Sequence, residues 1–308
     1  MLFDVETIKS TIKPVLKWVG GKRELLPELR KYYSGLKFNN YYELFVGGGS
    51  VYLDLVNNFP KVVSKSSIIN DVNTDLIEMY RNIKSRPSEV FSFCNVLEKE
   101  FYEYGYYHIR DRFNGVSREG EVVEKYKGII RSSSLILLNR TCFNGLYRTN
   151  KKGLFNVPEG RYNNPRIIDE ENLYNLSKIL PPVENILNKN FYEIDSIDKG
   201  DFVYLDPPYH PLNETSSFTD YSGEFGSKEQ VKLKDYFKML DEKGVYVLQS
   251  NSSSNFIKEI YSDFKILEID CKRNINSKGD KRGKVKEFLI IGNTLNQYLT
   301  NETTELLY

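Results

Sequence analysis

Residues Phe202–Tyr209 read FVYLDPPY, an apolar run that stops abruptly at an acidic residue and two prolines. Four consecutive apolar or aromatic residues are typical of a short strand that is buried on both faces. The two prolines fix φ and remove two N–H donors, so we expect the strand to end at Asp206. In open α/β sheets, ligands bind at the carboxyl ends of the strands, which predicts that Asp206 lies at a binding site.

Strands and helices alternate on both sides of this stretch. We expect further strands at Tyr41–Val46, Ser67–Asn70, Val245–Gln249, Phe264–Asp270 and Glu287–Ile291. Helices are expected from about Arg23, at Ser50–Val56, from about Thr74 with Asn73 or Thr74 as N-cap, at Lys228–Leu240 and at Ser254–Tyr261. This alternation predicts an α/β protein whose sheet is parallel or mixed and has helices on both faces.

Residues 76–190 interrupt the alternation. They are predicted to be helical as far as about Leu138 and then become rich in loops, with Asn-Gly and Asn-Pro pairs. A chain of 308 residues is long enough for about two domains. We therefore predict a sheet domain formed by residues 1–75 and 191–308, and an inserted, mostly helical domain formed by residues 76–190.

The composition excludes several classes of protein. No apolar run is longer than four residues, the length of Leu135–Leu138, which is far short of the roughly 18 residues of a membrane span, and the N-terminus lacks the apolar region of a signal peptide. Three widely spaced cysteines and two isolated histidines predict neither a disulfide framework nor a zinc site. We expect a cytoplasmic, metal-free protein that has no membrane association.

Positive charge is concentrated in two stretches, although the net charge of the chain is only +1. Residues 139–166 contain six basic residues and one acidic residue, and residues 272–286 contain seven basic residues and one acidic residue. Either stretch alone could be an ordinary solvated surface. The two together predict a polarised surface with a basic face, which can bind nucleic acid.

A glycine turn, Gly47-Gly48-Gly49, joins the first predicted strand to the helix that follows it. Such a turn lets a ligand approach the backbone at a helix N-terminus. The hydride-transfer fingerprint G-x-G-x-x-G fails, because Tyr52 stands where it requires a third glycine. Asp71 follows the next strand, at the place where an acidic side chain binds ribose hydroxyls in doubly wound folds. The glycine turn and Asp71 together predict a nucleoside-binding site.

A second glycine pair lies in Lys17–Lys22, which reads KWVGGK and precedes a helical run. The pair predicts a backbone turn at the start of the helix. Lys22 could meet a carboxylate of the ligand. The alternative is an N-terminal loop whose Trp18 packs into the core, and this segment alone does not decide between the two.

The stretch that follows the buried strand can recognise an exocyclic amino group. The Asp206 carboxylate and the rigid Pro207 carbonyl are two acceptors at a fixed separation, and an NH₂ group has two donors to match them. Tyr209 offers a ring face on which a planar base can stack. With the ordinary Asp pKa near 4, Asp206 is expected to orient the amino group more than to act as a strong base.

At this point the chain resembles the N6-adenine DNA methyltransferases of the Dam type, and in particular those that methylate adenine in GATC. The resemblance covers roughly residues 14 to 291. The motifs that carry it are Lys17–Lys22, Phe45–Gly49, Asn70-Asp71, Phe143–Arg148, Phe155–Tyr162, Asp206–Tyr209 and Ser250–Ser252. The departures are Glu159, where relatives commonly have a neutral or aromatic residue, and Asn163, where they often have lysine.

The resemblance implies a Rossmann-like methyltransferase sheet, S-adenosyl-L-methionine as methyl donor, and double-stranded DNA as substrate, with the target adenine flipped out of the duplex. It places the protein on the DNA of the cytoplasmic nucleoid and implies no obligate protein partner. The implied catalytic residues are Asp206, Pro207, Pro208 and Tyr209. The implied cofactor-binding residues are Trp18, Gly20, Gly21, Lys22, Phe45, Gly47, Gly49, Asp71, Phe191 and Asp206.

The DNA-binding residues are expected in the two basic stretches. They are Phe143, Asn144, Leu146, Arg148, Asn150, Pro158, Arg161, Tyr162, Lys281, Arg282 and Lys284. Asn144-Gly145 predicts a type I′ turn and a two-stranded ribbon, because both central residues of that turn need positive φ. We expect Phe143 to fill the space of the flipped adenine, Asn144 to meet the orphaned thymine and Arg148 to read guanine.

Other classes of protein fit less well. A non-catalytic DNA-binding homologue would be expected to have lost part of D-P-P-Y or the glycine turn, and this chain keeps both. Glutamine and cytosine-N4 methyltransferases usually carry Asn or Ser in place of Asp206. A methyltransferase with another recognition site and an RNA methyltransferase remain alternatives, but the Phe143–Arg148 segment favours duplex DNA.

Overall fold

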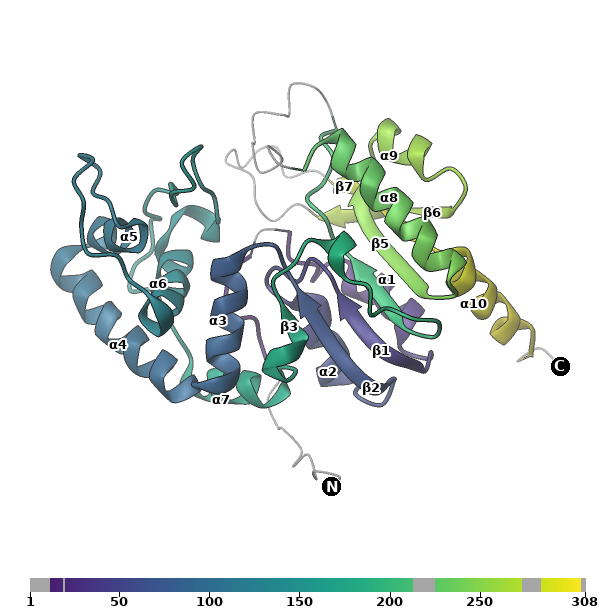
Figure 1. Ribbon diagram of the computed structural model, residues 1–308, viewed down its shortest axis with the longest axis horizontal. Coiled ribbons are helices and arrows are strands. Elements are labelled where there is room, and N and C mark those ends of the chain that lie inside the picture. Colours follow the sequence, from purple (N-terminus) through teal and green to yellow (C-terminus); the bar gives the residue numbers. More distant parts are fainter. Residues whose placement is uncertain (1–11, 19, 213–224, 273–283, 306–308) are drawn as a thin grey trace. The chain divides into compact units, whose positions relative to one another are not determined.

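The computed structural model describes residues 12–18, 20–212, 225–272 and 284–305 (Figure 1). The chain divides into two compact units. Unit 1 comprises Met1–Gly21, Gly47–Asn58 and Asn73–Asn188, and unit 2 comprises Lys22–Val46, Phe59–Val72 and Lys189–Tyr308.

A mixed sheet is the main feature of unit 2. The sheet has seven strands in the order β3-β2-β1-β4-β5-β7-β6, and all but β3 (Ile186–Leu187) belong to unit 2. These six are β1 (Phe38–Glu43), β2 (Val63–Asn70), β4 (Phe202–Leu205), β5 (Tyr246–Ser252), β6 (Lys265–Lys272) and β7 (Lys284–Ile291). Strands β2, β1, β4 and β5 are parallel, whereas β7 runs antiparallel to both β5 and β6.

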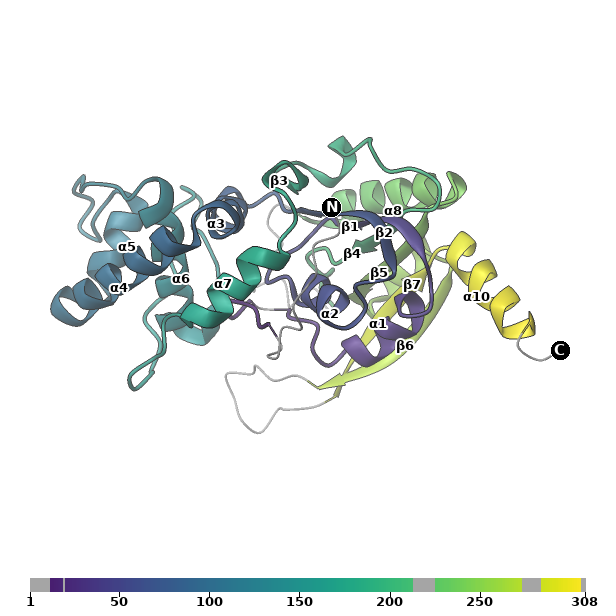
Figure 2. The same cartoon turned by 90° about the horizontal axis from the view of Figure 1, so that it is seen from below.

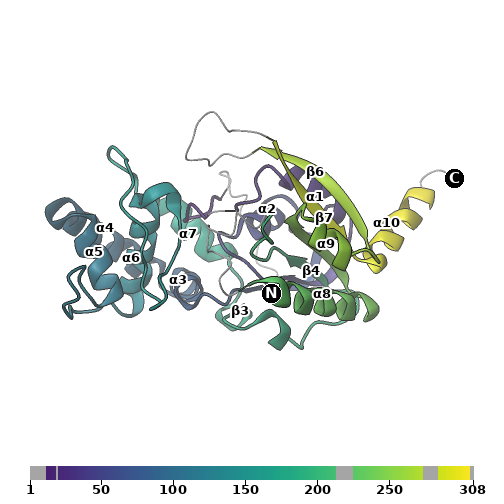
Figure 3. The same ribbon diagram turned by 90° about the horizontal axis from the view of Figure 1, so that it is seen from above.

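The α/β fold predicted from the alternating pattern is confirmed. The predicted buried strand is β4, whose four residues are all buried. Helices α1 (Leu26–Tyr33) and α8 (Ser227–Glu242) lie on opposite faces of the sheet in unit 2 (Figures 2 and 3). Strands β1, β2, β4 and β5 end at one edge, because they are parallel. Phe45, Asp71 and Asp206 therefore all follow strand ends at the same edge.

Several elements of unit 2 differ from the prediction: helix α1 begins at Leu26 and not at about Arg23, and strands β2 and β7 begin earlier than expected, at Val63 and Lys284. Strand β1 runs from Phe38 to Glu43, three residues earlier than expected at each end. Helix α10 (Asn293–Glu305) was not predicted, since Asn and Thr are weak helix formers. The Thr294 amide donates to the Asp241 carboxylate (2.8 Å), so a contact from α8 caps the start of α10. The helix expected at Ser254–Tyr261 is the shorter α9 (Asn255–Ile260), and Ser254 is its N-cap.

Unit 1 is mostly helical. Its helices are α2 (Ser50–Asn58), α3 (Thr74–Ser85), α4 (Pro87–Tyr104), α5 (Tyr106–Asn114), α6 (Gly128–Thr141) and α7 (Glu170–Ile179). Helix α3 begins as predicted, because the Asn73 side chain accepts a hydrogen bond from the Leu76 amide. The apolar run Leu135–Leu138 lies fully buried in α6, the central helix of this bundle.

The three cysteines are buried free thiols. Burial raises the pKa of both Cys94 and Cys142 to about 12, so neither is a thiolate at neutral pH. Among the described residues, no helix is long and apolar enough to cross a membrane, and no group of His, Cys, Asp and Glu could hold a metal ion.

Candidate active site and nucleic-acid interface

Asp206 is held by two donors within unit 2. The Lys22 ammonium lies 2.9 Å from Asp206 Oδ2, and the Ser250 hydroxyl donates to Asp206 Oδ1 (2.7 Å). The Ser250 oxygen is also 2.9 Å from the Tyr204 hydroxyl. Lys22 was expected at a ligand carboxylate, but in the structure its partner is the carboxylate of the D-P-P-Y motif itself.

The pKa of Asp206 is raised above its ordinary value. Burial is the main cause, and the ion pair with Lys22 and the Ser250 hydrogen bond oppose it. Glu287, a second carboxylate nearby, adds to the increase. Asp206 is therefore a more basic group than the solvated aspartate assumed from the sequence.

The side chain of Tyr209 is fixed at two points. Its hydroxyl donates to Glu287 Oε2 (2.8 Å), and the Lys22 ammonium lies 4.8 Å from the centre of its ring. The Pro208 carbonyl accepts from Gln230 Nε2 (2.8 Å), and Gln230 in turn accepts from Asn251. The turn after β4 is therefore tied to α8 and β5, which keeps the motif rigid.

An aromatic cluster stands at the same edge of unit 2. The ring centres of Phe45 and Phe191 are 5.6 Å apart, and Phe225 packs edge-on against Phe45 at 5.7 Å. Phe45 is partly exposed, and so is Asp71. An apolar aromatic wall and a carboxylate beyond neighbouring strand ends fit the base and the ribose of a nucleoside, so these residues fit an adenosyl cofactor.

In unit 1, the glycine turn lies against Trp18. A Cβ on Gly47 or Gly48 would come within 2.8 Å of Trp18 atoms. The glycine turn and the Trp18 segment can therefore pack this closely only because both positions are glycine. The Gly21 amide donates to the Trp18 carbonyl (3.3 Å), whereas the helix that the glycine pair was expected to start begins only at Leu26. Trp18 is partly exposed and its ring stacks on Tyr147, with centres 5.6 Å apart.

The Phe143–Arg148 segment, called the recognition segment below, contains the predicted turn but not the predicted two-stranded ribbon. Asn144 and Gly145 both have positive φ (56° and 64°), and the Leu146 amide donates to the Phe143 carbonyl, as in a type I′ turn. The flanking residues do not pair with each other. Cys142 pairs with Glu159 instead, and the Phe143 amide donates to the Pro158 carbonyl (2.9 Å). The prediction of a ribbon was wrong, because residues more distant in the sequence form the backbone hydrogen bonds of Cys142 and Phe143.

Asn139, which the sequence did not single out, connects this turn to the Lys17 segment. Its buried amide accepts from the Lys17 amide (2.6 Å) and donates to the Gly145 carbonyl (2.8 Å). Lys17 also lies with its ammonium 4.1 Å from the centre of the Tyr162 ring. The segment predicted to bind cofactor and the segment predicted to bind DNA are thus in direct contact within unit 1.

Most of the predicted DNA-binding side chains in unit 1 are exposed. These are Phe143, Arg148, Asn150, Pro158, Arg161 and Tyr162, whereas Asn144 and Leu146 are partly exposed. Asn150 accepts from two amides of its own loop, and Arg148 donates to Asn156 (2.8 Å). Lys281 and Arg282 lie outside the described residues, as does the side chain of Lys284.

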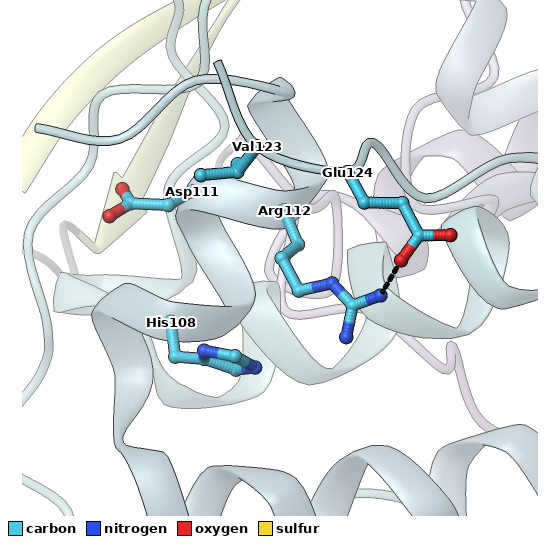
Figure 4. A pocket seen from close by; sticks show the side chains of 5 residues that line it. All are labelled: His108, Asp111, Arg112, Val123 and Glu124. Atoms are coloured by element: carbon cyan, nitrogen blue, oxygen red, sulfur yellow. Dashed lines mark hydrogen bonds and ion pairs between the residues drawn. The ribbon is translucent and has the colours of Figure 1, made fainter. Parts of the chain in front are cut away.

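One open pocket of about 300 Å³ lies elsewhere in unit 1 (Figure 4). Its lining residues are His108, Asp111, Arg112, Val123 and Glu124, and Arg112 donates to Glu124 (2.8 Å). None of the five belongs to the predicted cofactor, catalytic or DNA-binding sets.

Two residues of the site, Ser250 and Glu287, were assigned no role by sequence reasoning. Ser250 lies in a motif that the resemblance covers, and Glu287 lies in a predicted strand. Neither has a local pattern that indicates a partner, because each meets the D-P-P-Y turn only through the pairing of the sheet.

The mixed sheet, with β7 antiparallel between β5 and β6, has the Rossmann-like architecture of S-adenosylmethionine-dependent methyltransferases. Sequence comparison gives the family: the profile of the D12 class N6 adenine-specific DNA methyltransferases matches residues 18–275, and the chain belongs to this family. The protein is therefore an adenine-specific DNA methyltransferase that uses S-adenosyl-L-methionine.

Three relatives are similar to the chain over nearly their whole length. The chain is 39% identical to type II methyltransferase M1.LlaDCHI of Lactococcus lactis subsp. cremoris, covering 92% of this chain and 96% of the relative. It is 41% identical to type II methyltransferase M.MjaIII of Methanocaldococcus jannaschii, covering 88% and 95%. It is 35% identical to the DNA adenine methylase of Escherichia coli strain K12, covering 90% and 94%.

Proposed function

We propose that this enzyme methylates N6 of adenine within GATC in double-stranded DNA, after flipping the adenine out of the duplex. The observation that carries the chemistry of this proposal is the Asp206 carboxylate, held by Lys22 and Ser250 at the start of a rigid Pro-Pro-Tyr turn. The GATC site rests on the resemblance of the Phe143–Arg148 segment to the GATC-methylating group. We assign catalysis to Asp206, Pro207, Pro208 and Tyr209.

Asp206 has two tasks in this proposal. The adenine amino lone pair is delocalised into the ring, so N6 is a poor nucleophile. Hydrogen bonds to Asp206 and the Pro207 carbonyl favour a more tetrahedral nitrogen with its lone pair available. The nitrogen must lose one proton on methylation, and the raised pKa of Asp206 makes this carboxylate a better acceptor for that proton.

S-adenosyl-L-methionine, when bound, supplies an electrophilic methyl group for direct displacement. In unit 2, we propose that Asp71 holds the ribose hydroxyls and that Phe45 and Phe191 flank the base, with Lys22 and Asp206 also in contact. In unit 1, we assign cofactor contacts to Trp18, Gly20, Gly21, Gly47 and Gly49.

We propose that residues 76–190 form the target-recognition part of the chain. Phe143 is 42% exposed at the type I′ turn, so its ring is accessible, and this supports its role as the group that fills the space of the flipped base. Asn144, Leu146, Arg148 and Asn150 would contact bases or backbone, together with Pro158, Arg161 and Tyr162.

Two of the relatives are named type II methyltransferases. This supports the proposal that the enzyme protects DNA as the modifying half of a restriction–modification pair. Its place in the cell would then be with the DNA of the cytoplasmic nucleoid.

The proposal is tested by transfer of a tritiated methyl group to defined duplexes. We expect rapid labelling of a GATC duplex and little labelling of duplexes with any one of the four base pairs changed. Asp206→Ala should abolish transfer while specific duplex binding is kept. Equal labelling of GATC and changed sites would overturn the recognition site. An Asp206→Ala enzyme that keeps more than a few percent of the single-turnover rate would overturn the role of Asp206.

A further inference from the structure

The contact between Tyr209 and Glu287 joins distant parts of the chain. Tyr209 follows β4, whereas Glu287 lies on β7, the strand that runs against the direction of its neighbours. Glu287 pairs in register with Ser252 at the end of β5. The antiparallel direction of β7 thus brings a carboxylate to the edge where the parallel strands end.

The electrostatic effect of a carboxylate at this place is unfavourable. Glu287 raises the pKa of both Asp206 and Tyr209, because its negative charge opposes a second negative charge nearby. A neutral acceptor could bind the Tyr209 hydroxyl without this repulsion. A charged acceptor makes a shorter and stronger hydrogen bond to a hydroxyl, which restrains the ring more firmly.

The Tyr209 ring is restrained on a face as well as at its hydroxyl. The Lys22 ammonium lies over the ring at 4.8 Å and occupies one face, so a planar base would stack on the opposite face. The hydrogen bond to Glu287 prevents the ring from rotating away from Lys22. Together the two contacts set the plane in which a base can stack.

We propose that Glu287 is a positioning residue that fixes the Tyr209 ring for stacking on the extrahelical adenine. This inference rests on the proposed function of the D-P-P-Y motif. Glu287 touches neither the base nor the cofactor in this proposal, and it acts through the Tyr209 hydroxyl.

The test compares four variants by single-turnover methylation: Glu287→Ala, Glu287→Gln, Tyr209→Phe and the double variant Tyr209→Phe with Glu287→Ala. We expect Glu287→Ala to slow methyl transfer by about tenfold, with unchanged cofactor affinity and thermal transition. Glu287→Gln keeps an acceptor and should stay within about threefold of the wild type. With Tyr209→Phe already present, Glu287→Ala should cause no further loss, because the hydroxyl that it holds is gone.

The second readout is the fluorescence of 2-aminopurine placed at the target adenine. Weaker stacking on Tyr209 should raise the emission of the bound duplex in Glu287→Ala. Glu268→Ala is the matched control, since Glu268 lies on the adjacent strand β6, where it pairs with Lys286. It should leave both readouts unchanged.

The inference is overturned if Glu287→Ala keeps the wild-type rate, or if it slows Tyr209→Phe as much as it slows the wild type. The duplex is any one that the wild type methylates, so an error in the GATC assignment leaves this test intact. An Asp206→Ala enzyme that remains active would instead show that the D-P-P-Y assignment has failed.

Discussion

Asp206 is largely buried and lies next to two donors. Both donors lower the pKa of its carboxyl group, one by charge and the other by a hydrogen bond. Lys22 stabilises the carboxylate by charge, whereas Ser250 stabilises it by a hydrogen bond of 2.7 Å. Because burial still raises the pKa, the folded chain binds this proton more readily than the unfolded chain does. The contribution of Asp206 to the free energy of unfolding therefore grows as pH falls through its folded pKa toward the ordinary value of 3.8.

The activity depends on pH in the opposite sense, because transfer needs the carboxylate. Ser250→Ala removes a hydrogen bond that lowers the pKa of Asp206, so that pKa should rise further. We expect the acidic limb of the single-turnover rate profile to move to higher pH in this variant. Ser252→Ala is the control, since the buried Ser252 hydroxyl has no hydrogen-bond partner among the described residues. Identical acidic limbs in wild type and Ser250→Ala would contradict the prediction.

Gly48 permits the close approach of Trp18, and we expect any larger residue to disturb it. In Gly48→Ala, the new Cβ would lie 2.8 Å from Trp18 Cβ, so the tryptophan must move. Cofactor affinity should fall by about tenfold, or about 1.4 kcal/mol, in a calorimetric titration. Gly35→Ala, where no heavy atom lies within 4 Å of the new Cβ, should bind cofactor normally.

The sequence could predict where two residues of the candidate site stand in the fold. Asp206 was expected at a strand end because two prolines stop a buried strand, and Asp71 because it follows the next strand after a glycine turn, and both follow strand ends in the structure. The partner of Lys22 was not predictable from spacing, since 184 positions separate Lys22 from Asp206. Glu287 was not found because its contact depends on the direction of β7, which a strand pattern alone does not give.

Helices α3 and α6 are joined by a charged pair that reaches the recognition segment. Arg131 on α6 binds both oxygens of Asp75 (2.6 and 2.9 Å), and its guanidinium lies 4.0 Å from the centre of the Phe113 ring. The Tyr147 hydroxyl donates to the same carboxylate (3.2 Å), and Tyr147 stacks on Trp18. A helix–helix contact therefore supports the ring on which Trp18 rests.

We expect Arg131→Ala to destabilise unit 1 by about 2 kcal/mol, since both partners are mostly buried and Asp75 would lose its charge partner. Urea unfolding followed by fluorescence is suited to this test, because Trp18 is the single tryptophan of the chain. Arg166→Ala removes an exposed pair with Asp169 and should cost less than about 0.5 kcal/mol. Equal effects of the two variants would contradict the prediction.

Arg148 projects from the segment after the type I′ turn, and Asn156 restrains its guanidinium (2.8 Å). Arg148→Ala should lower methylation of GATC and narrow its advantage over duplexes changed at one guanine, by about 1–3 kcal/mol of discrimination. Competition between the two duplexes measures this directly. Lys151→Ala, in the neighbouring exposed loop, should affect both duplexes alike. Equal losses on both duplexes in Arg148→Ala would show that Arg148 only positions the backbone.

The two halves of the prediction for the Asn144 turn had different outcomes for a physical reason. Positive φ at Asn144 and Gly145 is a local property of those two residues, and it was predictable. The choice of hydrogen-bond partners for Cys142 and Phe143 is not local, because Glu159 and Pro158 compete for them. A turn can thus be read from two residues, whereas a ribbon requires its second strand to be known.

For the molecule as a whole, the alternation of strands and helices was sufficient to predict the sheet. The pattern left the sheet parallel or mixed, and the antiparallel direction of β7 against β5 and β6 is known only from the structure. The strand order and helix α10 could not be predicted from the sequence pattern, because both depend on contacts between residues that are distant in the sequence, such as that of Asp241 with Thr294.

The net charge of +1 predicts that DNA binding depends on local basic stretches. Neutralising Lys281, Arg282 and Lys284 together should weaken binding to all duplexes similarly. The slope of log affinity against log salt should flatten by about 0.9 for each phosphate that the variant no longer neutralises. Binding isotherms at several salt concentrations test this. A weakening confined to one base pair, with the slope unchanged, would count against a role of these residues at phosphates.

Strand β7 is fixed on both sides, since Glu287 pairs with Ser252 of β5 and with Ile269 of β6. These two ladders, and not the length of the connection 273–283, determine where Glu287 lies. Doubling the length of such a connection costs only about 0.6 kcal/mol in closure entropy. Insertions and deletions there can therefore accumulate, in evolution or in a library, while the support of Tyr209 by Glu287 stays in place.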